Sequence, residues 1–265
     1  MILTLTPNPS IDATLSLDEP LTTGLVHRAR SVSQVAGGKG INVTHAAYLA
    51  EHPTVALFPA GPSDLFLSLV EDAALPYEAV PLDHTIRVNT TITDPSGGTT
   101  KINGPGPLVG PEVQQELLQR LGALSAKADW VVLAGSLPPG CPTDWYSSLI
   151  KALRSASPQT RISVDTSDQP MLEIARNLET AAPDLLKPNG FELGQLAGED
   201  GLALEEQAAR GDYSGVVAAA RSVVQRGVGE ILVTLGGAGA VLVTADRAWV
   251  ATPSAAEVVS TVGAG

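Results

Sequence analysis

Short runs of apolar residues recur along the chain and are separated by stretches long enough to form a helix. Uninterrupted apolar runs are typical of strands that are buried on both faces of a sheet. The expected strands are residues 2–6, 55–58, 130–134, 161–165, 184–187 and 230–235. This alternation predicts an α/β fold with a doubly wound, mostly parallel sheet that carries helices on both faces.

The stretches between these strands show helical spacing. In residues 111–127 the apolar positions Val113, Leu117, Leu121 and Leu124 recur at intervals of three and four. Similar stretches predict helices over residues 41–51, 144–156 and 216–227, the last with a glycine stop.

Three segments instead alternate polar and apolar residues, which is typical of strands with one wet face. They are residues 12–17, 26–35 and 87–102, and the Asp94 to Gly98 cluster within the last segment predicts a turn that joins two strands. We expect a small sheet, inserted at about residues 11–35 and 86–103, that acts as a lid over one edge of a single domain spanning residues 1–265. Its exposed surface could also join two copies of the chain in a homodimer.

Polar or small residues follow nearly every predicted core strand. They are residues 8–10, 61–63, 135–140, 165–167, 187–189 and 236–239. Because the carboxyl ends of parallel strands meet at one edge of a sheet, ligands bind in the crevice outside that edge. The pattern therefore predicts one shared cleft.

The charge balance is acidic, with 28 Asp and Glu against 16 Lys and Arg. Nucleic acid and anionic membranes are therefore unlikely partners, and no apolar run is long enough to span a bilayer. The single cysteine, Cys141, excludes a disulfide within the chain and favours a reducing, cytoplasmic location.

Basic and amide side chains collect in the lid segments. Arg87, Asn89, Lys101 and Asn103 lie there, and we expect Arg28 and Lys39 to approach them in space. On an acidic chain such a group predicts a substrate that carries a phosphate, although such residues taken singly more often lie on a solvated strand face.

Two glycine-rich segments are candidate anion sites. Residues 37–40, Gly-Gly-Lys-Gly, precede a predicted helix, and the last residues, Gly263, Ala264 and Gly265, follow an apolar run. Free backbone N–H groups at a helix start attract anions. Plain glycine turns remain the alternative for both segments, and residues 37–40 are not a Walker A loop.

Asn189 and Glu192 begin a predicted helix and allow two interpretations. They suit a capping box, in which each side chain accepts a hydrogen bond from the other residue's backbone N–H. They equally suit a site that orients a hydrated Mg²⁺, which keeps several waters and uses few protein ligands.

Together these motifs resemble the phosphofructokinase B group of the ribokinase-like carbohydrate kinases, and most of all its 1-phosphofructokinases and tagatose-6-phosphate kinases. The matching segments are residues 8–12, 36–43, 102–106, 135–138, 187–192 and 262–265. They occur in the family's order over the whole chain.

The resemblance implies a role for each matching residue on the sugar side. Asp12, Gly38, Lys39 and Asn42 match positions that bind and orient the sugar hydroxyls. Arg87 and Asn103 match lid positions near the substrate phosphate.

It likewise implies ATP and Mg²⁺ as cofactors. Lys187, Thr234, Gly236, Gly237 and Gly239 match nucleotide contacts, and Asn189 and Glu192 match the motif that organises Mg²⁺. Gly263, Ala264 and Gly265 match the anion hole for the transferred phosphoryl group.

The implied reaction is transfer of the ATP γ-phosphate to fructose 1-phosphate, with tagatose 6-phosphate or fructose 6-phosphate as alternative acceptors. In the family an aspartate that acts as the general base follows the Gly-Ala-Gly. The sequence stops at Gly265, so we also consider an inactive protein that only binds sugar phosphate and nucleotide. Thr91 and Lys101 depart from the family's usual lid lysine and acidic residue, which leaves the acceptor open.

Overall fold

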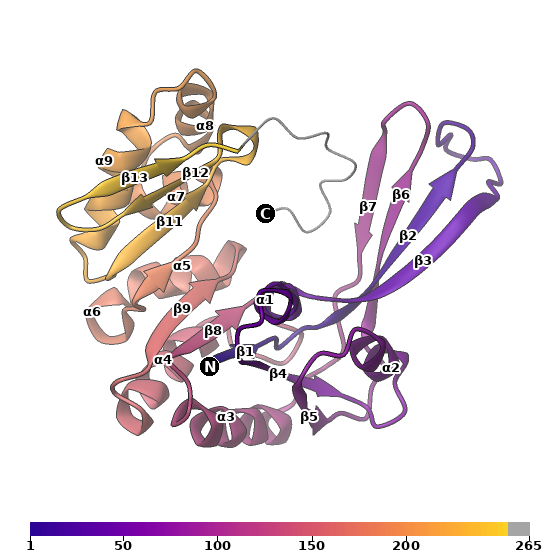
Figure 1. Cartoon of the computed structure of the whole chain (residues 1–265), viewed down its shortest axis with the longest axis horizontal. Coiled ribbons are helices and arrows are strands. Elements are labelled where there is room, and N and C mark those ends of the chain that lie inside the picture. The colour runs from indigo at the N-terminus through magenta and orange to yellow at the C-terminus, as the bar shows by residue number, and fades with distance from the viewer. Residues whose placement is uncertain (254–265) are drawn as a thin grey trace.

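A computed structural model of the chain describes residues 1–253. Its main sheet has nine strands in the order β13-β12-β11-β10-β9-β8-β1-β4-β5 (Figure 1). Their bounds are β1 Ile2–Leu5, β4 Thr54–Ala60, β5 Tyr77–Pro81, β8 Trp130–Ala134, β9 Arg161–Asp165, β10 Leu185–Leu186, β11 Glu230–Thr234, β12 Ala240–Val243 and β13 Ala248–Ala251. All neighbours from β5 to β11 pair in parallel, whereas β11, β12 and β13 pair antiparallel. The predicted parallel core is therefore confirmed.

All six predicted strands are present, but three further strands, β5, β12 and β13, were missed. The strand predicted at residues 230–235 ends at the glycine-rich segment after it, which forms the one-turn 3₁₀ helix η1, Gly236–Ala238. Gly239 follows with a φ of 95°, so the chain reverses and β12 pairs with β11. Glycine adopts such a φ readily, which explains why a hairpin forms here.

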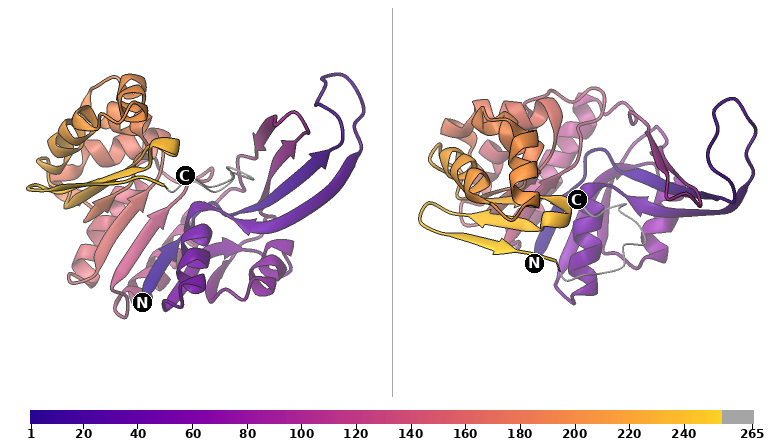
Figure 2. Two further views of the ribbon diagram at one scale, coloured as in Figure 1. Left: turned by 45° about the horizontal axis from the view of Figure 1, so that its top comes forward. Right: turned by 90° about the horizontal axis from the view of Figure 1, so that it is seen from above.

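Helices cover the main sheet as predicted for a doubly wound fold. Their bounds are α1 Lys39–Leu49, α2 Leu65–Asp72, α3 Pro111–Ser125, α4 Trp145–Ala156, α5 Asp168–Arg176, α6 Leu178–Ala181, α7 Gly190–Ala197, α8 Gly201–Ala209 and α9 Ser214–Val224. The buried Thr4 and Thr44 hydroxyls hydrogen-bond at 2.8 Å, which fixes α1 on one face of β1. Helices α3 and α9 pack against other parts of the sheet, and their arrangement is visible in Figure 2.

The lid is a second sheet of four strands in the order β3-β2-β6-β7, and it projects from the main sheet (Figure 2, left). Its strands are β2 Ser10–Leu17, β3 Ala29–Gly37, β6 Arg87–Thr93 and β7 Thr99–Asn103. The predicted turn between β6 and β7 is present, and Asp94 Oδ1 accepts hydrogen bonds from the backbone N–H groups of Ser96 and Gly98.

Strand register gives the lid sheet two different faces. Asp12 pairs with Asn89, and Asn89 pairs with Asn103, so these three side chains form one row on one face. Ile11 pairs with Val88 one residue away and therefore lies on the opposite face. The lid thus has a polar face and an apolar face.

No helix within residues 1–253 is both long enough and apolar enough to cross a bilayer.

Phe58 ties the β5 edge of the sheet to α2. Its ring is fully buried, contacts Phe66 edge-on with centroids 5.0 Å apart and stacks on Tyr77 at 5.5 Å. We expect Phe58→Ala to lower the free energy of unfolding by about 3–5 kcal/mol, because it leaves a cavity and removes two aromatic contacts. Urea unfolding followed by circular dichroism measures this change.

Phe191→Ala is the matched control, since Phe191 is 48% exposed. It should change the unfolding free energy far less. Equal losses in the two variants would contradict the packing described for Phe58.

Candidate active site

The carboxyl ends of the central parallel strands carry the predicted site residues. Strand β1 leads to Asn8, β9 ends at Asp165, β10 leads to Lys187 and β11 ends at Thr234. Their parallel pairing places these ends at one edge of the sheet. In Figure 1 the lid rises beside the same edge, next to the start of α1.

Asp165 joins two lysines that the sequence analysis assigned to different ligands. Lys39 Nζ lies 2.6 Å from Asp165 Oδ1, and Lys187 Nζ lies 3.2 Å from Asp165 Oδ2. The aspartate is only 7% exposed, so its charge needs such partners. The structure therefore brings the predicted sugar residue Lys39 and the predicted nucleotide residue Lys187 to one carboxylate.

The sequence analysis placed Asp165 only in a polar loop after a strand. An acidic residue at the end of a predicted core strand was the available signal, since buried carboxylates are rare without a partner. The partners themselves could not be found from sequence, because Lys39 lies 126 positions away.

Asp12 lies against the glycine loop that begins α1. Its Oδ1 atom accepts hydrogen bonds from Ser10 Oγ at 2.7 Å and from Asn89 Nδ2 at 3.0 Å. A Cβ atom on Gly37 would collide with the Asp12 carboxylate, and Gly38 has a φ of 116°. The glycines thus allow the loop to approach Asp12 closely and then start the helix, which a plain surface turn would not require.

Asn42 and Asn103 approach the same region from two elements. Asn42 is exposed in the first turn of α1, where its backbone N–H donates to Gly38 O at 2.9 Å. Asn103 is exposed at the end of β7, in the row that contains Asn89 and Asp12.

Arg87 braces the base of the lid. Its guanidinium donates to Asn8 O and Gly104 O at 3.0 Å each and to Pro9 O at 3.4 Å. These carbonyls belong to the segments that enter and leave the lid. Burial lowers the pKa of Arg87, and the charge of Asp12 partly opposes this shift. A guanidinium has five N–H groups, so some remain for a ligand.

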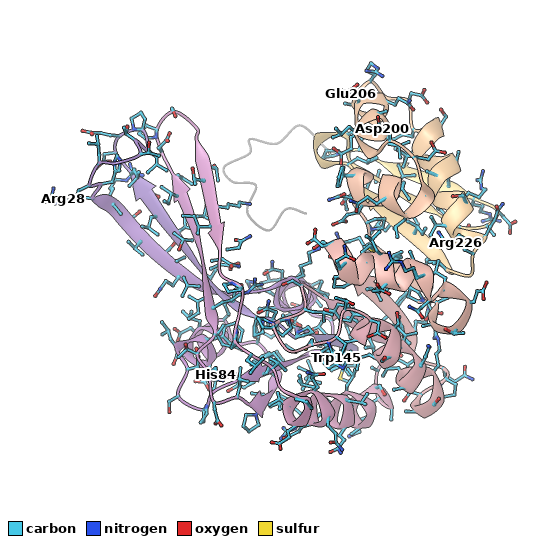
Figure 3. All side chains as sticks on the ribbon, turned by 180° about the vertical axis from the view of Figure 1, so that it is seen from behind. Arg28, His84, Trp145, Asp200, Glu206 and Arg226 are labelled. Carbon is cyan, nitrogen blue, oxygen red and sulfur yellow. The ribbon has the colours of Figure 1, made fainter. Side chains whose placement is uncertain are left out.

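The expected cluster of basic residues around Arg87 is only partly present. Figure 3 shows Arg28 near the far end of the lid, away from the main sheet, so the expectation that it approaches the site was wrong. A hairpin tip cannot be placed from local sequence alone, because its position depends on the length and tilt of both strands.

The predicted nucleotide loops lie side by side. The backbone N–H of Thr234 donates to Pro188 O at 3.0 Å, and Asn189 forms a parallel bridge with Thr234. Gly236 and Gly237 then form η1, whose turn is held by Tyr213, since its hydroxyl donates to Ala238 O at 2.8 Å.

Asn189 and Glu192 form the predicted capping box. The Glu192 N–H donates to Asn189 Oδ1 at 2.7 Å, and the Asn189 N–H donates to Glu192 Oε2 at 2.8 Å. The cap leaves the second Glu192 oxygen for another partner, so the donor set still fits a Mg²⁺ held mainly by water and phosphate. Within residues 1–253 there is no cluster of three or more His, Cys, Asp or Glu side chains that could hold a metal.

The acidic stretch after Gly198 contributes to this side of the site. It contains α8, and Glu205 Oε1 on that helix accepts a hydrogen bond from the Phe191 N–H at 3.2 Å. Glu205 thus helps to satisfy the free N–H groups at the start of α7.

Several buried oxygens at the base of the lid have no hydrogen-bond partner among the described residues. They are Thr6 Oγ1, Asn8 Oδ1 and Asn89 Oδ1. Native proteins leave few buried polar atoms unpaired, and those that remain often mark functional sites. Gly263, Ala264 and Gly265, the predicted anion hole, lie outside the described residues.

A parallel α/β sheet with a polar lid over its carboxyl edge defines the class of ribokinase-like kinases. Residues 6–265 match the model of the pfkB family carbohydrate kinases, so the chain belongs to that family. The chain is 33% identical to a 1-phosphofructokinase of Xanthomonas campestris pv. campestris, over 99% of this chain and 80% of that relative. It is also 33% identical to an ATP-dependent 6-phosphofructokinase isozyme 2 of Mycobacterium tuberculosis, over 100% of this chain and 74% of that relative.

Among solved structures, the chain superposes on the tetrameric inhibited form of phosphofructokinase-2 from Escherichia coli. The TM-score is 0.85 at 27% sequence identity, and the match covers 100% of this chain and 83% of that chain. The fold expectation is therefore confirmed, including the small second sheet.

Gly37→Ala tests the contact between the glycine loop and Asp12. The added methyl group would displace the Asp12 carboxylate, because its nearest neighbours would be the atoms of that group. We expect the affinity for a sugar phosphate to fall about tenfold or more, with the affinity for ATP unchanged. Isothermal titration calorimetry measures both.

Gly110→Ala serves as the control, since a Cβ there would meet no atom within 4 Å and the φ of −73° suits any residue. A Gly37→Ala protein that binds the sugar as tightly as this control would argue against Asp12 as a sugar contact.

Proposed function

We propose that the protein transfers the γ-phosphate of ATP to the free primary hydroxyl of fructose 1-phosphate and forms fructose 1,6-bisphosphate. The observation that carries this proposal is the ion-paired cluster of Lys39, Asp165 and Lys187, which joins the sugar loop to the nucleotide loop. The name of the Xanthomonas relative, 1-phosphofructokinase, supports this acceptor.

Each side of the cluster has its own binding groups in this proposal. Asp12, Gly38, Lys39 and Asn42 orient the sugar hydroxyls. Arg87 offers its remaining N–H groups to the sugar phosphate, and Asn103 lies near that phosphate. Lys187, Thr234 and the glycines Gly236, Gly237 and Gly239 hold ATP. Asn189 and Glu192 orient a hydrated Mg²⁺, which supplies charge neutralisation at the phosphates when bound.

The charges of the cluster suit phosphoryl transfer. Transfer occurs between two anionic ligands, and its transition state spreads negative charge over the phosphoryl oxygens. Two ammonium groups held at fixed positions stabilise that charge without reorganising during the reaction. Gly263, Ala264 and Gly265 would add backbone N–H groups as an anion hole.

Fructose 6-phosphate and tagatose 6-phosphate are the alternative acceptors. The name of the Mycobacterium relative, an ATP-dependent 6-phosphofructokinase, favours the first of these. Lys101 pairs in register with the buried Thr91 on the polar face of the lid, so this row differs from the family's usual lysine and acid.

Titration of the chain with all three ketose phosphates, with turnover followed by ³¹P NMR, tests the acceptor. We expect fructose 1-phosphate to bind most tightly and to be converted in the presence of Mg-ATP. Binding without turnover would instead support the inactive binding protein considered from the sequence. Failure to bind any of the three would overturn the proposal.

Arg87→Met tests the phosphate contact within the same experiment. We expect it to weaken sugar-phosphate binding about tenfold or more with little effect on ATP, because the lost guanidinium lies at the sugar side. Arg28→Met is the control, since the same change of charge at the far end of the lid should alter neither affinity. Equal losses for sugar and ATP in Arg87→Met would count against its assignment.

We also propose that two copies pair through the apolar face of the lid. On the face opposite Asp12, Val32 is 62%, Val88 44% and Ile102 60% exposed. An exposed apolar cluster of this kind on a sheet is typical of an interface. The Escherichia coli structure is described as tetrameric, so assembly is known for a protein of this fold.

Analytical ultracentrifugation of Ile102→Lys tests the pairing. A buried lysine would destabilise the interface, so we expect a shift from dimer to monomer. Leu202→Lys, at a leucine 62% exposed on α8, should leave the sedimentation unchanged. A wild-type monomer at micromolar concentration would contradict the pairing.

A cytoplasmic location agrees with the proposed use of ATP. It also agrees with the burial of the single thiol, Cys141, which raises its pKa to about 12 and leaves it mostly protonated at neutral pH.

A further inference from the structure

The side-chain amide of Asn89 lies between two predicted sugar contacts, Asp12 and Asn103, in the polar row of the lid. Its Nδ2 atom donates to Asp12 Oδ1 at 3.0 Å. We infer that Asn89 is a positioning residue that holds the Asp12 carboxylate in the orientation needed to accept a hydroxyl of the ketose. This inference rests on the proposed function.

The hydrogen bonds of Asp12 are distributed unevenly over its two oxygens. Oδ1 accepts from both Asn89 Nδ2 and Ser10 Oγ, whereas Oδ2 accepts no hydrogen bond among the described residues and lies beside Gly37. Two donors on one oxygen fix the carboxylate plane, and they leave the other oxygen as the acceptor for a ligand. Such fixed groups bind without first being ordered, which raises affinity.

While its Nδ2 atom donates to Asp12, the side-chain oxygen of Asn89 is left without a hydrogen bond. Asn89 Oδ1 is buried and has no partner among the described residues. A 180° rotation of the Asn89 amide would exchange Nδ2 and Oδ1. The amide oxygen would then face the Asp12 carboxylate, and the two groups would repel each other. An unpaired buried oxygen is destabilising, so the presence of an asparagine at this position favours function over stability.

A second side-chain hydrogen bond joins the same two strands but does not involve Asp12. Thr93 lies on the same strand and pairs with Ser16 of β2, and its hydroxyl donates to Ser16 Oγ at 3.4 Å. This pair joins the same two strands toward the turn end of the lid. It therefore offers a matched control that changes lid packing without touching Asp12.

Asn89→Leu tests the inference, because leucine keeps the branched shape but removes both the donor and the unpaired oxygen. By titration calorimetry we expect the dissociation constant for fructose 1-phosphate to rise about tenfold or more, and that for ATP to stay unchanged. The midpoint of urea unfolding should stay the same or rise. Thr93→Val should alter neither affinity.

A double-mutant cycle with Asp12→Ala separates positioning from a direct contact. If Asn89 acts through Asp12, the double variant should bind the sugar no more weakly than Asp12→Ala alone. Additive losses would overturn the positioning role.

Asn89→Asp adds a pH readout that a purely structural role would not give. At neutral pH the new carboxylate repels Asp12, and at lower pH a shared proton restores a donor. We expect its sugar affinity, relative to wild type, to recover as the pH falls from 7.5 to about 5. A ratio that does not vary with pH would oppose the inference.

The possible outcomes distinguish this inference from the proposed function. If wild type binds fructose 1-phosphate and Asn89→Leu binds it equally well, the positioning role is wrong and the proposed function stands. If Asn89→Leu loses stability and both ligands together, Asn89 is merely structural and the inference also fails. If wild type binds no ketose phosphate, both fail.

Discussion

A buried carboxylate that needs positive partners fixes the layout of this site. Asp165 ends a strand in which the other buried side chains are apolar or small, and at 7% exposure its charge would be strongly unfavourable alone. Lys39 comes from the start of α1 and Lys187 from the end of β10, so the ion pairs hold two separate segments at the same point. Removing Asp165 would leave both lysine charges without this partner, which is more destabilising than losing a surface ion pair.

The lid depends on this edge in a second way. The chain enters the lid at Asn8 and Pro9 and leaves it at Gly104, and the Arg87 guanidinium bonds to carbonyls of all three. The register of the lid strands then determines which side chains share a face, because a shift by one residue would exchange the polar and apolar faces. The Arg87 hydrogen bonds at the base of the lid and the register of its strands together determine where the row of Asp12, Asn89 and Asn103 lies.

The sequence sufficed for the central fold because strands buried on both faces have a simple signature. Residues 130–134 are almost wholly apolar, and the structure places a strand there with the same bounds. The edge strand β5 carries Glu78 among apolar residues and lacks that signature, and β12 is an apolar segment of only four residues after the glycine turn. The short helix α5 was missed as well, since it contains a proline near its start.

The sequence predicted many of the site residues, but it did not predict the hydrogen bonds and ion pairs that join them. The glycine loop, Lys39, Lys187 and the Asn189–Glu192 cap were evident as local motifs, and the cap has the predicted geometry. The bonds that relate them are tertiary: Asp165 to Lys39, Glu205 to the start of α7, and Asn89 to Asp12. Such contacts depend on how distant segments pack, which no local pattern encodes.

A crystal structure of the protein with fructose 1-phosphate and a non-hydrolysable ATP analogue tests the central claim most directly. We predict that the free primary hydroxyl of the sugar and the γ-phosphate meet beside Asp165, with Lys39 and Lys187 on either side. Ligands bound on separate surfaces, with the three charged side chains between neither of them, would contradict it.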